Sequence, residues 1–138
     1  MKSRDKNPFE AYRKTEVVTA NRETILLMLY AGAIRFLKGA IKRSEEGNVG
    51  ESTRLISKTQ EIVNELRCSL NFEAGGEIAK NLDDLYAYIT QRLIESNLDK
   101  NTQYLRDALS VLETLHSAWE QAVGSLKQKE QDVQPKQG

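Results

Sequence analysis

Glu113 and His116 are the side chains whose types and spacing come closest to a reactive site in this chain. The Glu-x-x-His spacing places both side chains on one face of a helix, and in helical bundles two such motifs together hold a pair of iron or manganese ions. His116 is the only histidine, so one chain cannot supply the second motif. We therefore expect His116 to lie at the edge of a helical interface, and a metal ion shared between two copies is the alternative.

Other kinds of catalytic site find little support in the sequence. A serine or cysteine nucleophile needs a base, and only His116 or a lysine with a shifted pKa could serve. Gly75 and Gly76 are typical of a connection between helices and not of a phosphate-binding loop after a strand. We predict no catalytic residue, no cofactor and no metal ligand. An enzyme or metalloprotein that uses Glu113 and His116 stays the alternative.

The composition fits one soluble domain whose main partner is neither nucleic acid nor an anionic membrane. The 138 residues carry 20 basic and 20 acidic side chains, whereas both of those partners select an excess of basic charge. Cys68 is the only cysteine, which excludes a disulfide within the chain and favours a reducing compartment. The first residues lack the apolar core of a signal peptide, and no run approaches the roughly 20 apolar residues of a membrane span. We therefore expect a cytoplasmic protein without membrane insertion.

Helix signals run through nearly the whole chain. The two prolines, Pro8 and Pro135, lie at its extremes, and apolar residues between them recur at helical spacing. Asn21 is a suitable N-cap, because its side chain can accept a hydrogen bond from the first turn of a helix. We predict helices at residues 22–46, 49–71, 77–96 and 101–126.

Four amphipathic helices with short connections predict an all-α fold, an antiparallel four-helix bundle at residues 21–126. A short, partly flexible N-terminal arm at 1–20 is expected to pack along the bundle, and the polar residues 127–138 are expected to form a disordered tail. In the third helix the stripe expected to face inward is Ile78, Leu82, Leu85, Ile89 and Leu93.

The first predicted helix has more apolar surface than one core requires. Residues 25–30 are Ile, Leu, Leu, Met, Leu and Tyr, and consecutive positions at about 100° each reach every side of a helix. A surface helix of a bundle needs one apolar stripe. Either this helix is the most enclosed one of the domain, or its surplus is covered by the arm, by a second copy or by a partner.

Short runs in and around this helix, and others further along the chain, are similar to the signature of the FliS family of flagellar export chaperones. In chain order the runs are Ala11-Tyr12, Val17, Thr19-Ala20, Leu27-Met28-Leu29-Tyr30, Gly32-Ala33-Ile34, Phe36-Leu37, Leu85-Tyr86-Ala87-Tyr88, Arg92-Leu93, Asn97 and Ala118-Trp119. The chain departs from the family at Asn21-Arg22, where Ser-Pro is usual, and at Ala31, where an acidic or amide residue is usual.

The resemblance implies a small protein of the bacterial cytosol that holds newly made flagellin before its secretion. It implies one-to-one binding of the disordered C-terminal segment of flagellin, protection against premature polymerisation, and delivery to the flagellar type III export apparatus. The export gate and other export components are implied as further partners. The residues alone indicate an interaction module, and a self-associating helical-bundle adaptor without a flagellin client stays the alternative.

Candidate partner-binding residues are those that match the family signature and exceed the needs of one core. They are Tyr12 and Val17 in the arm, Leu27, Tyr30 and Ile34 in the first helix, and Tyr88 in the third. Leu55 and Ile62 are added from periodicity alone, because they widen the apolar stripe of the second helix on one side. Trp119 lies on the apolar stripe of the fourth helix and is expected in the core.

Overall fold

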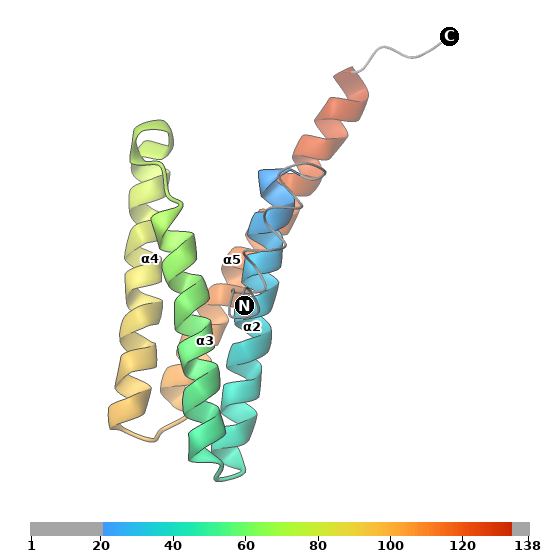
Figure 1. Cartoon of the computed structure of the whole chain (residues 1–138). Coiled ribbons are helices and arrows are strands. Elements are labelled where there is room, and N and C mark those ends of the chain that lie inside the picture. Colours follow the sequence, from blue (N-terminus) through green and yellow to red (C-terminus); the bar gives the residue numbers. More distant parts are fainter. Residues whose placement is uncertain (1–20, 134–138) are drawn as a thin grey trace, which may run out of the picture.

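The computed structural model describes residues 21–133 of the chain, and the side chains of residues 21–129. This part of the chain contains four helices and no strand (Figure 1): α2 (Arg22–Glu45), α3 (Val49–Cys68), α4 (Phe72–Leu98) and α5 (Gln103–Val133). The arm predicted for residues 1–20, with Tyr12 and Val17, lies outside the described residues.

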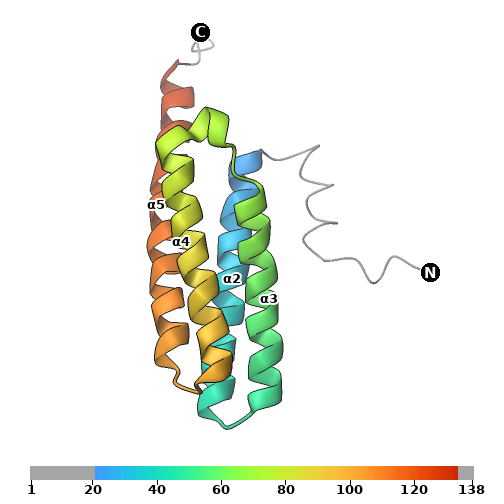
Figure 2. The ribbon, with the colours of Figure 1, turned by 90° about the vertical axis from the view of Figure 1, so that its left-hand side faces the viewer.

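The four helices form a ring in which each packs against two neighbours. α2 contacts α3 and α5, and α4 contacts the same two helices. Figure 1 and Figure 2 show successive helices running in opposite directions, joined by short connections. The predicted antiparallel four-helix bundle is therefore confirmed.

Asparagine side chains cap the N-termini of the helices. Asn21, Asn48 and Asn71 each accept a hydrogen bond from the backbone N–H three residues later, at 3.1, 3.2 and 3.0 Å. Asn101 accepts one from the N–H two residues later, at 2.9 Å. These bonds satisfy donors that have no partner within the helix, and Asn21 caps α2 as predicted.

Two helix boundaries differ most from those expected, the start of α4 and the end of α5. Gly76 has φ +49° and interrupts α4, so the turn that begins at Phe72 is set off from the regular helix that follows; a left-handed φ is accessible to glycine because it has no Cβ. α5 continues to Val133, so residues 127–133, expected to be disordered, are helical. The Lys, Gln and Glu residues there have high helix propensity even without an apolar stripe.

The core consists of the apolar stripes that the helices turn inward. Its most deeply buried aliphatic side chains include Leu37, Val63, Leu66, Ile89, Leu93 and Leu112. On α3 the buried arc is wider than one row, and Leu55 and Ile62 belong to it. The reason is that α3 lies between α2 and α4 and contacts both. The expectation that these two residues form spare surface is therefore wrong.

α2 is long and apolar enough to cross a membrane by length and composition, contrary to the expectation that no segment would be. In this structure 44% of its most apolar window is buried inside the bundle. Its apolar character is accounted for in part by packing between α3 and α5.

Candidate functional site

The bundle is open at one end. Toward the end where α2 begins and α3 ends, α2 and α5 separate from α3 and α4 (Figure 1). A cavity of ≈ 350 Å³ lies there, and all four helices contribute to its lining. Its main apolar residues are Leu26, Leu66, Leu70, Ile78, Leu82 and Trp119. We call this cavity the end groove.

A second hollow, of ≈ 510 Å³, lies beside the end groove between α2 and α3. The two share Leu26 and Ser69, and Ile25 and Leu29 also line the second hollow from α2. Part of the surplus apolar surface predicted for residues 25–30 is therefore turned toward these two openings. Charged side chains join the lining at Arg22, Glu23 and Glu65.

Apolar groups dominate the end groove and its surroundings. Ile78 on its rim is 68% exposed, and Phe72, at the start of the same helix, is also exposed. The polar side chains are engaged locally: the Ser69 hydroxyl donates to the Leu66 carbonyl at 2.7 Å, and Asn71 caps α4. Exposed apolar surface of this kind is typical of surfaces that contact another molecule.

A buried pair of tyrosines lies at the inner end of the end groove, where Tyr86 lines the cavity and Tyr30 contacts Tyr86. Tyr30 of α2 and Tyr86 of α4 are 0% and 1% exposed, and their hydroxyls hydrogen-bond to each other. Burial raises the pKa of both hydroxyls, so both remain protonated at neutral pH. The hydrogen bond from Tyr86 opposes this rise in the pKa of Tyr30 but is the smaller effect. The His116 ring stacks on Tyr30 with centroids 6.2 Å apart.

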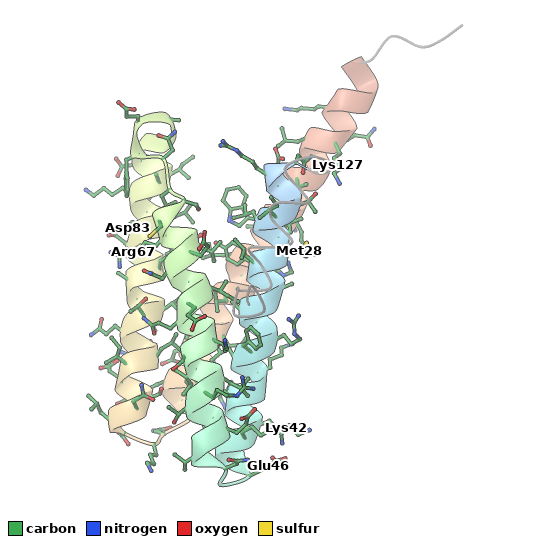
Figure 3. The ribbon with its side chains drawn as sticks, viewed as in Figure 1. Met28, Lys42, Glu46, Arg67, Asp83 and Lys127 are labelled. Carbon is green, nitrogen blue, oxygen red and sulfur yellow. The ribbon has the colours of Figure 1, made fainter. Side chains whose placement is uncertain are left out.

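An ion pair holds α3 to α4 beside the end groove. The Arg67 guanidinium donates to both carboxylate oxygens of Asp83, at 2.5 and 3.3 Å, and Figure 3 shows the two side chains next to each other between these helices. The hydrogen bond from Arg67 lowers the pKa of the Asp83 carboxyl. The pair fixes one wall of the groove, because Leu66 and Leu82, its sequence neighbours, line the cavity.

Leu27, Ile34 and Tyr88, three of the predicted partner-binding residues, are at least partly accessible but lie outside the end groove. Leu27 and Ile34 are half-buried on α2, and Ile34 lines a separate hollow of ≈ 550 Å³ between α2 and α5. Tyr88 on α4 is 38% exposed, with the Arg92 guanidinium 5.4 Å from its ring centroid. Their contact with a partner stays a prediction.

Tyr30, Leu55 and Ile62 lie in the core instead. These three side chains are 0%, 9% and 3% exposed, so they offer a partner little or no surface in this structure. Trp119, predicted in the core, is half-buried: it packs against the core cluster and also lines the end groove.

The sequence pattern did not reveal Leu70, Ile78 and Leu82 as groove residues. Ile78 and Leu82 belong to the stripe that was expected to face a packed core, and Leu82 still packs against it. What the pattern could not show is that the facing helices separate at this level. The run at residues 25–30 was the available signal, since Leu26 lies opposite in the same cavity.

Glu113 and His116 do not converge on a common site. Glu113 pairs with Lys38 at 3.4 Å, and the Nε2 of His116 lies 3.9 Å from Glu120. Over residues 21–133 there is no cluster of three or more His, Cys, Asp or Glu side chains that could hold a metal ion.

The comparisons with known proteins agree with each other. A family model described as "Flagellar protein FliS" matches residues 5–126. The chain is 34% identical over 116 residues to the flagellar secretion chaperone FliS of Vibrio cholerae serotype O1, covering 81% of this chain and 85% of that one. It is 34% identical over 109 residues to the protein of the same name from Salmonella typhimurium (78% and 81% covered). The protein of that name from Bacillus subtilis is 29% identical over 119 residues (86% and 88%).

Proposed function

This chain belongs to the FliS family of flagellar secretion chaperones, and from that premise we propose that it binds the disordered C-terminal segment of flagellin, one to one, before secretion. The family is one of chaperones and not of enzymes, so a chaperone role in flagellar export follows from membership. What we propose beyond membership is the client segment itself. In this proposal the protein acts in the bacterial cytoplasm, prevents premature polymerisation of flagellin and aids its delivery to the flagellar type III export apparatus.

The end groove is the observation that supports this client most directly. An apolar cavity of about 150 Å³ is large enough for benzene, and the end groove measures ≈ 350 Å³, which leaves room for roughly two large aliphatic side chains. A disordered segment with apolar residues at helical spacing supplies such side chains as it folds on the surface. The hollow between α2 and α3 continues the apolar path along α2.

The energetics favour an interface larger than one cavity. Ordering a disordered segment opposes binding by about 2–5 kcal/mol or more, whereas a dissociation constant of 1 μM corresponds to about −8 kcal/mol. Two or three buried side chains contribute on the order of 5 kcal/mol before that loss. The client must therefore extend beyond the end groove, and the hollow between α2 and α3, with the half-buried residues of α2, is where we expect it to continue.

The test is a calorimetric titration of the full chain with a peptide of the C-terminal segment of the same organism's flagellin, followed by circular dichroism. One-to-one binding at micromolar affinity or tighter, with a gain of helix over the sum of the free components, is the expected result. A peptide of the same composition in scrambled order is the control and should not bind. A folded, monomeric chain that does not bind the natural peptide would refute the proposed client.

Light scattering of the free chain distinguishes the proposed chaperone from the alternative, a self-associating bundle without a flagellin client. A stable dimer at micromolar concentration that no longer binds the peptide would mean that a second copy covers the end groove.

A further inference from the structure

We propose that the buried pair Tyr30–Tyr86 sets the width of the end groove and thereby acts as a positioning pair for partner binding. The identity of the partner rests on the function proposed above, whereas the width of the groove rests on the geometry of the pair.

The pair spans a diagonal of the bundle. The packed pairs of helices are neighbours in the ring, and α2 and α4 are not among them. Tyr30 extends from α2 and Tyr86 from α4, and their hydroxyls meet at an angle, with the ring centroids 6.5 Å apart and the ring planes tilted by 44°. A tyrosine ring cannot shorten, because only the two torsions near the backbone can rotate. Both rings are enclosed by the core, at 0% and 1% exposure, which restricts these torsions. The contact between the two hydroxyls therefore opposes a closer approach of α2 and α4, a separation that packing between neighbouring helices leaves free.

The pair stands where the closed part of the bundle becomes the open part. On the closed side, Leu37 and Ile89 are fully buried. On the open side, Leu26 and Leu82 line the end groove, and each lies four residues, or about one helical turn, from one of the two tyrosines. A change in the α2–α4 separation at the tyrosines is therefore passed directly to these two groove walls.

The two hydroxyls contribute little to the free energy of unfolding beyond what apolar rings of the same shape would contribute. A buried hydroxyl is unfavourable unless it has a hydrogen-bond partner, and here each hydroxyl satisfies the other. When both partners of such a bond are replaced by apolar groups of the same shape, the effect on folding is close to neutral. What two phenylalanines cannot reproduce is the length of the span between α2 and α4.

The double variant Tyr30→Phe/Tyr86→Phe isolates that length, because it removes both oxygen atoms and leaves neither hydroxyl unpaired. Without them α2 and α4 can approach, and the end groove narrows at Leu26 and Leu82. We expect a urea midpoint close to that of the wild-type chain. Acrylamide should quench the fluorescence of Trp119, the only tryptophan of the chain, less strongly than in the wild type. The dissociation constant for the flagellin peptide should rise on the order of tenfold, the equivalent of about two buried methylene groups.

Tyr104→Phe is the matched control, because Tyr104 is a half-buried tyrosine on α5 outside the groove whose hydroxyl donates to Asp99 at 3.5 Å. It should leave both the quenching and the affinity unchanged. If the double variant does not fold, the single variant Tyr86→Phe is compared with the wild-type chain by the same two measurements.

Quenching and affinity that both equal the wild-type values in the folded variant would overturn the proposal. A wild-type chain that does not bind the peptide, together with weaker quenching in the variant, would refute the proposed client and uphold the role of the pair in setting the width of the end groove. The quenching measurement needs no client, so the two failures are distinguishable.

Discussion

Three isoleucines can separate the stability of the bundle from partner binding, because they sit in different surroundings. Ile62 of α3 is 3% exposed in the core, Ile78 on the rim of the end groove is 68% exposed, and Ile94 on α4, outside the groove, is 52% exposed. The perturbation is the same in each case, a change of isoleucine to alanine. Only the environment of the side chain differs.

The magnitudes follow from burial. The change removes three carbon groups, worth about 2.4 kcal/mol when fully buried at about 0.8 kcal/mol each. Ile62→Ala also leaves a cavity, so we expect a loss of about 3–4 kcal/mol in the free energy of unfolding. For Ile78→Ala, roughly a third of the transfer energy acts in folding, below about 1 kcal/mol. The other two thirds, about 1.6 kcal/mol, acts when a partner covers the side chain, which weakens binding about 15-fold.

Urea unfolding measures the first quantity and calorimetric titration with the flagellin peptide the second. Ile62→Ala should lower stability and leave the affinity of the folded protein unchanged. Ile78→Ala should lower the affinity for the peptide and change stability only slightly. Ile94→Ala is the control and should leave binding unchanged, with part of its small stability loss offset by the higher helix propensity of alanine.

Two results would refute this reasoning. Weaker binding by Ile94→Ala, with Ile78→Ala like the wild type, would move the partner from the end groove to another face of α4. A stable Ile62→Ala variant that binds poorly would make Ile62 a direct contact, as its position beside the stripe of α3 first indicated.

Three further outcomes are expected. Binding of the flagellin peptide should shift the emission of Trp119 to shorter wavelength, because a client in the end groove removes water from its ring; unchanged emission at saturation would place the client elsewhere. Asp83→Asn should lower stability at neutral pH, since Arg67 lowers the pKa of the Asp83 carboxyl in the folded state. That stabilisation is present above the unfolded pKa of about 3.9 and is lost as the pH falls through the lowered folded pKa; the urea midpoints of the two proteins should therefore converge in acid, and a constant difference would refute the role of the ion pair. Tyr12→Ala should weaken client binding with unchanged helicity, whereas a collapse in thermal melting would make Tyr12 a structural strap.

The fold could be predicted because its determinants are local. Asn21 satisfies backbone donors of its own helix, and that bond depends on residues within one turn. The apolar spacing of α4 likewise placed Ile89 and Leu93 correctly in the core. The assumption that a helix buries only one apolar stripe was too narrow where two neighbouring helices enclose it. For that reason Leu55 and Ile62 were expected at the surface and lie in the core.

The candidate site could not be predicted in the same way, because it depends on the distance between helices. Leu82 follows the same periodicity as Ile89, and nothing in that periodicity distinguishes a level where helices touch from one where they separate. The buried tyrosines show the same limit: Tyr30 and Tyr86 were each recognisable as signature residues, but their hydrogen bond joins positions 56 residues apart. A pattern on one helix carries no information about such a pair.

The ring of helices also has a consequence for how the chain folds. Three of its four packed pairs join helices that are consecutive in sequence, and only α2 with α5 closes the ring across the length of the domain. Domains dominated by local contacts fold within about microseconds to milliseconds. The closing contact includes ion pairs of Lys38 with Glu113 and of Glu45 with Arg106, which require the last helix. During synthesis α2, α3 and α4 are complete before α5 emerges from the ribosome, so the wall of the groove that carries Trp119 is the last of the four to be added.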